Sequence, residues 1–289
     1  MNRDILSVIE NQMPTFSKGQ KLIANYILQS YDKAAFMTAS KLGQTVKVSE
    51  STVVRFAAEL GYDGYPAMQR TLQEMIRNKL TSVQRIEVSD DRIGSHDILS
   101  MVMHSDMDKL RMTLEQIDRA HFEGAVQDIV KAKRIYILGV RSASAIATFL
   151  AFYFNLIFDN ATLVSISSAS EIFEQLLRVG PEDVVIGVSF PRYSKRTVKA
   201  MEFARDRGAQ VIAITDSEAS PLSAAAQRLL LAKSDMVSFV DSLVAPLSLV
   251  NALIVAIARV KKQELSENLE KLEHIWAEYE VYETVEDRS

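Results

Sequence analysis

Between residues 134 and 232, five short runs rich in valine, isoleucine and leucine alternate with stretches of helical spacing. Such runs are typical of strands buried on both faces of a parallel sheet. Strands that alternate with helices indicate a parallel sheet covered by helices on both sides. The sequence therefore predicts an α/β domain over residues 104–284, with strands at 134–139, 161–166, 184–189, 210–216 and 228–232.

Residues 1–78 follow a different pattern, with helical spacing throughout and no strand signal. Ser17 and Gln20 form a capping-box sequence, and Thr38 and Ser49 are capping residues for two further helices. These helices are predicted at 39–45 and 50–60, the second ending at Gly61. An all-α domain over 1–78 and a polar linker over 79–103 follow from this pattern.

Within this domain, the segment TASKLGQTVKVSESTVVRFAAELGY (38–62) supplies two helices joined by a short turn. Val53, Phe56, Ala57 and Leu60 are spaced as a buried stripe on the second helix. The opposite side is outward-facing and can enter a DNA major groove, where residues at the helix amino terminus reach base edges. Lys41, Lys47 and Arg70 are available for phosphate contacts. The predicted DNA-contacting set is Lys47, Ser49, Glu50, Ser51, Thr52 and Arg55.

A plain helical bundle with solvated charges is the alternative interpretation of the same spacing. The distribution of charge favours DNA binding mildly. Residues 1–80 carry ten Lys/Arg against seven Asp/Glu, whereas the rest of the chain carries 23 against 30. The front of the chain is therefore the part expected to meet a polyanion.

Two loops follow predicted strands in the second domain, at 139–144 and 189–194. The carboxyl edge of an open α/β sheet is where ligands bind, and helix amino termini there offer free N–H groups to an anion. Hydroxyls and guanidinium groups on both loops suit a phosphate monoester carried by a polyol. Each serine singly is also an ordinary helix cap. The predicted ligand-binding set is Arg141, Ser142, Ser144, Ser189, Arg192 and Ser194.

Several other site classes find no support in the sequence. The turn after the first strand has Gly139-x-Arg141-x-x-Ser144 in place of the dinucleotide-binding G-x-G-x-x-G, and no P-loop is present. The chain has no cysteine, and its four histidines lack metal-ligand spacing, so neither a metal nor a cofactor is predicted. No signal region or membrane span is evident, which predicts a cytoplasmic protein with no membrane partner.

The residues VSESTVVRF (48–56) followed by ELGYDGY (59–65) resemble the amino-terminal domain of the RpiR family of bacterial transcriptional regulators. Residues 130–260 resemble the SIS domain, the sugar-isomerase fold that serves as the sensor of these regulators. The resemblance assigns the phosphate-binding turn to 139–144 and the second serine-rich loop to 189–194. Arg141 stands where the common pattern has glycine, and Phe-Pro-Arg-Tyr at 190–193 replaces a softer Ser/Gly-rich run.

The resemblance implies a regulator whose operator affinity responds to a phosphorylated sugar, with no catalytic residues. The alternative is a sugar-phosphate isomerase, for which Glu171 and Glu174 are the candidate bases. A glutamate at a helix start more often compensates the helix dipole. Apolar stretches at 242–253 and 265–279 predict a homodimer or homotetramer, since helix-turn-helix proteins commonly place two recognition helices in successive major grooves.

Overall fold

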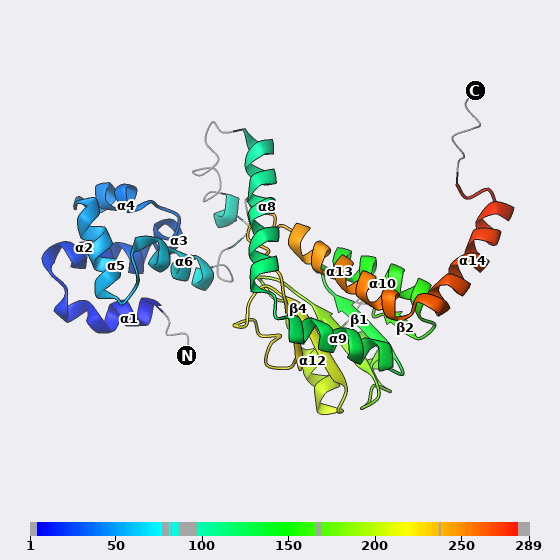
Figure 1. The fold of residues 1–289 in the computed structure, drawn as a ribbon. Helices are drawn as coiled ribbons and strands as arrows, with labels where there is room; N and C mark the ends of the chain where they lie inside the picture. The colour runs from blue at the N-terminus through cyan, green and yellow to red at the C-terminus, as the bar shows by residue number, and fades with distance from the viewer. Residues whose placement is uncertain are drawn as a thin grey trace, which may run out of the picture. The chain divides into compact units, whose positions relative to one another are not determined.

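The computed structural model describes residues 5–76, 81, 83–86, 97–165, 169–236 and 238–282. The chain forms two compact units: Met1–Val102 with Met236–Asp241, and Met103–Asp235 with Ser242–Ser289 (Figure 1). Much of the predicted linker at 79–103, including residues 87–96, lies outside the described residues. Its boundaries therefore stay a prediction.

Three helices of the helical unit begin at the capping residues that the sequence predicts. The side chain of Ser17 accepts from the Gln20 N–H in a complete capping box, and Thr38 and Ser49 cap two later helices in the same way. Gly61 has a φ of 88° and ends the last of these. The helices are α1 (Ile5–Gln12), the 3₁₀ turn η1 (Met13–Thr15), α2 (Lys18–Gln29), α3 (Tyr31–Ala34), α4 (Ala39–Val46), α5 (Glu50–Glu59) and α6 (Tyr65–Ile76).

A single core holds these helices together, with apolar side chains from α1, α2, α4, α5 and α6 fully buried. Phe16 and Phe56 meet edge to face within it, with ring centroids 5.1 Å apart. Met236 packs against this core although it follows the last strand of the other unit by only a few residues. The segment Met236–Asp241 is thus part of the helical unit.

The second unit is built on a five-stranded parallel sheet, as the sequence predicts, and the strand order is β2-β1-β3-β4-β5. Ile135 pairs with both Ala161 and Val184, and Gly139 lies opposite Val188. The strands are β1 (Ile135–Gly139), β2 (Ala161–Leu163), β3 (Val184–Val188), β4 (Gln210–Thr215) and β5 (Arg228–Leu231). Each strand begins or ends inside its predicted bounds, by one residue in four of them and by three residues in β2.

Helices cover both faces of this sheet (Figure 1). Alternate strand residues such as Ile137 and Ile186 pack against α9 (Arg119–Lys131), α10 (Ala143–Ile157) and α13 (Val244–Val260). Their neighbours Leu138 and Val185 face α11 (Ala169–Gln175) and α12 (Lys195–Asp206). The predicted three-layer α/β architecture is confirmed. Two longer helices complete the fold: α8 (Ile98–Gln116), which precedes α9, and α14 (Lys262–Glu278), which follows α13.

Among the described residues, no single helix is both long and apolar enough to cross a membrane. Only α13 and α14 taken together reach the length and apolar composition of a membrane-spanning segment, and the chain bends by 98° between them.

Candidate nucleic-acid interface and candidate anion site

The turn between α4 and α5 is tight, and a glycine makes this possible. Lys47 ends α4 in the left-handed conformation with a φ of 58°, and the Val48 N–H donates to the Gly43 carbonyl at 2.9 Å. A Cβ on Gly43 would lie only 2.9 Å from the Val48 carbonyl oxygen. The close approach of the two helices therefore depends on Gly43, and Lys47 adopts the strained backbone that glycine would adopt freely.

One side of α5 is buried and the other is open. Val53, Phe56 and Ala57 are fully buried, whereas Leu60 is half-buried and so only partly joins the predicted stripe. The predicted contact residues Lys47, Ser49, Glu50, Ser51 and Arg55 are exposed, and Thr52 is half-buried.

Hydrogen bonds order the amino-terminal turn of α5. The Ser49 Oγ accepts from the Thr52 N–H at 3.3 Å and lies 2.9 Å from the Ser51 hydroxyl. The Arg55 Nε donates to the Ser51 carbonyl at 3.2 Å, which holds the guanidinium along the helix surface. An exposed helix start with hydroxyls, one arginine and a positive dipole end is suited to a DNA groove.

The loop after β1 combines an exposed arginine with two exposed serines. Arg141 is left-handed with a φ of 60°, and its carbonyl accepts from the Ser144 hydroxyl at 2.5 Å. Ser142 immediately precedes α10, yet its side chain makes no capping hydrogen bond. A Cβ on Gly139 would lie 2.6 Å from the Ala143 carbonyl oxygen, so only glycine fits at this position.

The loop after β3 is held by hydrogen bonds between its own serines. The buried Ser189 Oγ accepts from the Ser194 N–H at 3.1 Å, and the Ser194 Oγ caps α12 by accepting from the Thr197 N–H at 3.3 Å. A serine hydroxyl that accepts such a bond can still donate its proton to an anion. Arg192 is exposed and left-handed, with a φ of 66°.

The sheet brings these two loops to the same edge. Gly139 and Val188 are register partners on neighbouring parallel strands, so the chain leaves both strands at the same level. In the order β2-β1-β3-β4-β5, the connections from β1 and β3 run to opposite sides. Such a switch point is the usual ligand position in an open α/β sheet.

Thr197, in the first turn of α12, is the residue that sequence inspection missed. Its side chain is fully buried, and its Oγ1 has no hydrogen-bond partner within the described part of the chain. A buried hydroxyl without a partner is unfavourable in a folded protein. At the amino terminus of a helix that follows the Ser189–Ser194 loop, this points to a group that binds there. Its position two residues after Lys195, inside a hydrophobic period, gave no signal in the sequence.

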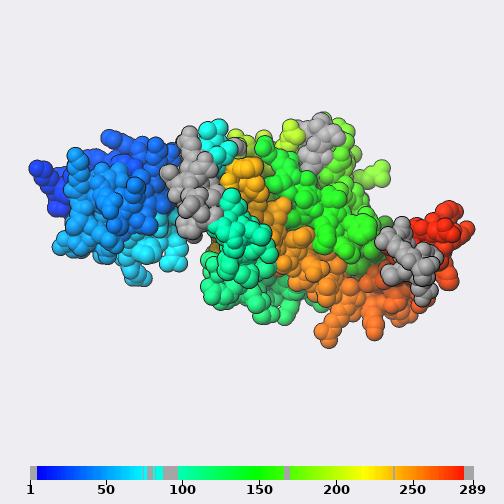
Figure 2. Space-filling model, turned by 90° about the horizontal axis from the view of Figure 1, so that it is seen from above, coloured from blue at the N-terminus to red at the C-terminus, as the bar shows by residue number. Residues whose placement is uncertain are grey.

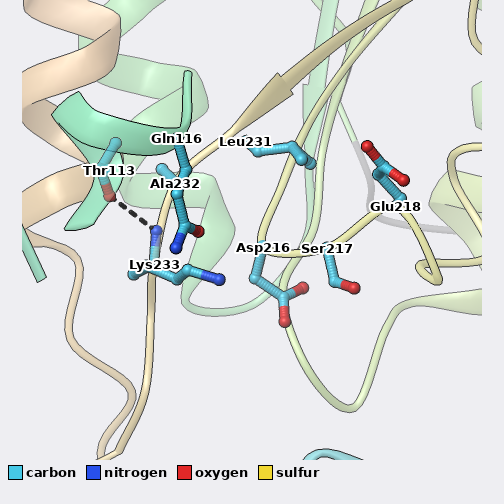
Figure 3. A pocket seen from close by; sticks show the side chains of 8 residues that line it. All are labelled: Thr113, Gln116, Asp216, Ser217, Glu218, Leu231, Ala232 and Lys233. Carbon is cyan, nitrogen blue, oxygen red and sulfur yellow. Dashed lines mark hydrogen bonds between the residues drawn. The ribbon is translucent and has the colours of Figure 1, made fainter. Parts of the chain in front are cut away.

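A pocket of about 280 Å³ adjoins this edge at the ends of β4 and β5 (Figure 3). The hydroxyl of Tyr193, from the loop after β3, donates a hydrogen bond to the Asp216 Oδ1 at 2.8 Å. This bond links the loop to a residue that lines the pocket. The Lys233 N–H donates to the Thr113 Oγ1 at 3.0 Å, which ties α8 to the end of β5. The pocket is lined by Thr113, Gln116, Asp216, Ser217, Glu218, Leu231, Ala232 and Lys233.

The two candidate bases lie on α11, the helix that follows β2. Glu171 is half-buried and its carbonyl accepts from the Gln175 Nε2, while Glu174 is exposed. Residues 166–168, which lead into α11, lie outside the described residues. Across the part of the chain that is described, no three His, Asp or Glu side chains gather as metal ligands.

Comparison with known families agrees with this division of the chain. Residues 3–79 match the helix-turn-helix domain of the rpiR family, and residues 128–256 match the SIS domain. The first match contains the α4–α5 pair, and the second contains the whole sheet.

Individual relatives match long stretches of the chain. The HTH-type transcriptional regulator HexR of Escherichia coli is 26% identical over 225 residues, which cover 76% of this chain and 74% of HexR. The sugar isomerase domain of an RpiR transcription factor from Sphaerobacter thermophilus is 28% identical, covers 62% of this chain and 99% of that one, and superposes with a TM-score of 0.59.

A third relative matches nearly end to end. The structure of NanR from Vibrio vulnificus, complexed with ManNAc-6P, shares the fold at 24% identity and a TM-score of 0.59, covering 95% of this chain and 98% of NanR. With an rpiR-type helix-turn-helix domain joined to a SIS domain on the five-stranded sheet described above, this chain belongs to the RpiR family of transcriptional regulators.

Proposed function

We propose that the chain binds an operator through the exposed start of α5 and that a phosphorylated sugar at the β1/β3 edge changes its operator affinity. The DNA contacts come from the turn and the first two turns of the recognition helix. Arg55 lies one turn after the helix start, where a guanidinium can pair with a guanine edge, and Lys47 lies where it reaches a phosphate. The contact residues are Lys47, Ser49, Glu50, Ser51, Thr52 and Arg55.

The unpartnered Thr197 hydroxyl is the observation that supports the phosphate site most strongly. A phosphate at the amino terminus of α12 would accept from this hydroxyl, from backbone N–H groups and from the neighbouring serines. The loop after β1 adds a hydroxyl that no cap uses, that of Ser142. The full proposed set is Arg141, Ser142, Ser144, Ser189, Arg192 and Ser194, joined by Thr197.

The polar pocket beside this loop suits the hydroxyl-bearing end of the same ligand. It presents a carboxylate, an amide and an ammonium group from Asp216, Gln116 and Lys233. Figure 3 shows the Lys233 amine and the Asp216 carboxylate directed toward the same space. Such a mixture of donors and acceptors matches the alternating hydroxyls of a sugar chain. The ligand of NanR, ManNAc-6P, has this chemistry and is a sensible first compound to test.

The regulatory step requires that the sugar phosphate bind the DNA-competent and DNA-incompetent forms with different affinities. We further propose that the protein acts in the cytoplasm as a homodimer or homotetramer, because two recognition helices are needed to read successive major grooves. Catalysis plays no part in this proposal, and Glu171 and Glu174 serve as controls for it.

The proposal is tested by fluorescence anisotropy on DNA from upstream of the protein's own gene and on a scrambled duplex, at two salt concentrations. Each titration is repeated with glucose 6-phosphate, fructose 6-phosphate and ManNAc-6P. We expect operator binding that resists salt better than scrambled binding and that one sugar phosphate changes. Because it removes a base contact, Arg55→Ala should reduce operator affinity about 10-fold or more, on the basis of about 1–3 kcal/mol for a bidentate pair, with a smaller loss on scrambled DNA.

Thr197→Val provides the matched test of the effector site. The substitution keeps the side-chain shape and removes the hydroxyl, so operator binding should persist while the sugar-phosphate response weakens about 10-fold or more, as expected for the loss of about 1.5–3 kcal/mol from a hydrogen bond to a charged group. A normal response in this variant would place the ligand elsewhere. Turnover of any of the three sugar phosphates that Glu171→Gln or Glu174→Gln abolishes would favour the isomerase instead.

A further inference from the structure

The chain leaves the pocket through the interior of the protein. Leu231, Ala232 and Lys233, at the end of β5, line the pocket, and the Lys233 N–H donates to the Thr113 Oγ1 of α8 at 3.0 Å. Ala232 and the next residue after Lys233, Ser234, are buried, the latter completely. Buried side chains in a protein are closely packed, so the backbone here moves together with the pocket wall.

Two residues further on, the same chain belongs to the helical unit. Met236 packs against the core of that unit, and its backbone forms an antiparallel bridge with Asp241. Asp241 in turn pairs with the buried side chain of Arg85. Lys233 and Met236 are three residues apart, so the extended chain between them spans at most about 11 Å. A connection this short takes up only a small displacement at either end.

The far end of the same segment returns directly to the larger unit. Ser242 follows Asp241 without an intervening residue, and its Oγ donates to the Asp106 Oδ1 of α8 at 2.7 Å. The same carboxylate oxygen accepts from the Nζ of the buried Lys109 at 3.2 Å. Figure 2 shows the chain at the start of α13, in gold, beside α8, in teal. The segment Met236–Asp241 is thus held to α8 through the residues on both of its flanks.

α8 presents the same face to the pocket and to Ser242. Thr113 lines the pocket, and Asp106, which binds Ser242, lies seven residues earlier in α8. Seven residues are about two turns of a helix, so the two side chains point in the same direction. A ligand in the pocket therefore contacts β5 and the face of α8, which together hold both flanks of Met236–Asp241.

α8 also carries the chain from the helical unit to the larger one, between Val102 and Met103. The side chains at its start are mostly exposed, with Ile98 at 58% and Leu99 at 72%. Met236, in contrast, contacts the core of the helical unit, and the residue at the other end of its bridge pairs with a buried arginine. Within the described residues, Met236–Asp241 is therefore the passage more firmly attached to the helical unit.

We propose that the connection from Lys233 to Met236 transmits the sugar-phosphate response from the pocket to the helical unit. The position of Lys233 then differs between the DNA-competent and DNA-incompetent forms, and a ligand that contacts it binds one form more tightly. Binding at the pocket and binding at α5 are coupled in both directions, because linkage is reciprocal. The inference rests on the proposed function and adds the route by which the effector changes operator affinity.

Lengthening the connection tests this route in the full-length protein. Two glycines inserted between Asp235 and Met236 add up to about 7 Å of chain and leave every pocket-lining residue unchanged. Operator affinity is measured by anisotropy with and without ManNAc-6P, glucose 6-phosphate and fructose 6-phosphate, and the affinity for each sugar phosphate is measured by calorimetry. We expect normal affinity for operator and for sugar phosphate separately. The sugar phosphate should change operator affinity by less than about 2-fold, against at least about 5-fold in the natural chain.

Two point variants in the same segment form a matched pair. Met236→Ala removes the contact with the helical core and should weaken the response as the insertion does. Phe239→Ala removes a side chain that is 57% exposed and should respond like the natural chain. A natural response in the insertion variant would overturn the proposed route and leave the proposed function intact.

Hydrogen exchange gives a measurement that needs no sugar phosphate. Because coupling is reciprocal, operator DNA should change the exchange rates of the amides at 231–235 by at least about 5-fold in the natural chain but not in the insertion variant. Unchanged rates in the natural chain would show that the route lies elsewhere. If no sugar phosphate changes operator affinity, these rates alone decide the route. If the operator is not bound, the proposed function and the route are both wrong.

Discussion

Arg85 and Asp241, 156 positions apart in the chain, form an ion pair in which the Arg85 Nη1 lies 2.9 Å from the Asp241 Oδ1. The Arg85 side chain is only 3% exposed. Asp241 belongs to Met236–Asp241, the segment between β5 and α13 that forms part of the helical unit. The ion pair therefore attaches the segment Met236–Asp241, which follows β5 in the chain, to the helical unit.

Asp241→Asn should destabilise the helical unit, because it removes the charge of a carboxylate that pairs with a buried guanidinium. Breaking one partner of a buried pair typically lowers the free energy of unfolding by about 3 kcal/mol. Thermal unfolding and amide hydrogen exchange of α1–α6 measure the effect. Asp206→Asn is the control, since Asp206 pairs with Arg205 on an exposed surface and its loss should change stability by less than about 1 kcal/mol. Equal effects of the two variants would contradict a structural role for the Arg85–Asp241 pair.

Gly43→Ala should disturb the turn between α4 and α5. The new Cβ would lie 2.9 Å from the Val48 carbonyl oxygen, a backbone atom that cannot move without shifting α5. Overpacking typically costs about 1–3 kcal/mol, against a helix-propensity gain of about 1 kcal/mol for alanine over glycine. We therefore expect reduced thermal stability and a larger loss of operator affinity, both measured on the same preparation.

The control for this variant is Gly19→Ala on α2. There the nearest atom to a new Cβ is the Thr52 Cγ2 at 3.4 Å, which is an ordinary contact with a side chain. This variant should keep the stability and the operator affinity of the natural chain. If Gly19→Ala lost both thermal stability and operator affinity, the helical unit would be sensitive to any added methyl group. The effect of Gly43→Ala would then not be specific to the α4–α5 turn.

Local signals in the sequence were sufficient for much of the fold. Ser17, Thr38 and Ser49 cap helices as predicted because capping depends on neighbours within three residues. The five strands were found because strands buried on both faces are continuous apolar runs. The apolar stripe at 265–279 was also visible in the sequence, and in the structure its apolar residues are half-buried or exposed.

Features that depend on contacts between distant residues were missed. The burial of the Thr197 hydroxyl arises only after β3 and α12 have packed. The pocket draws Thr113 and Asp216 from elements about 100 positions apart. Membership of Asp241 in the helical unit depends on its pairing with Arg85 and has no counterpart in local sequence pattern. The predicted site residues themselves await the binding measurements.

Tyr65 should make the helical unit sensitive to alkaline pH. Burial raises the pKa of Tyr65 from 10.0 to about 12, and its hydroxyl donates to the Met37 carbonyl at 2.7 Å. In the unfolded chain the phenol loses its proton near pH 10, before the folded protein does. Its contribution to stability is therefore complete below pH 10 and falls by about 1.4 kcal/mol per pH unit between about 10 and 12. Urea unfolding of natural protein and Tyr65→Phe at pH 8 and 11 measures this; parallel losses in both would refute the assignment.

Arg141 allows a test of whether its guanidinium binds the ligand or blocks the site. Its left-handed backbone is strained by about 1–2 kcal/mol, which glycine would relieve, but glycine also loses about 0.4–1 kcal/mol through the entropy of the unfolded chain. Arg141→Gly should therefore keep the stability of the natural protein to within about 1 kcal/mol, whereas Arg141→Ala retains the strain.

If the guanidinium binds phosphate, both variants lose sugar-phosphate affinity equally, by about 10-fold, measured by calorimetry. A gain of affinity in both would show instead that Arg141 occupies the site. Lys133→Ala, in an exposed ion pair with Glu182 beside the amino end of β1, is the control for lost charge and should bind normally.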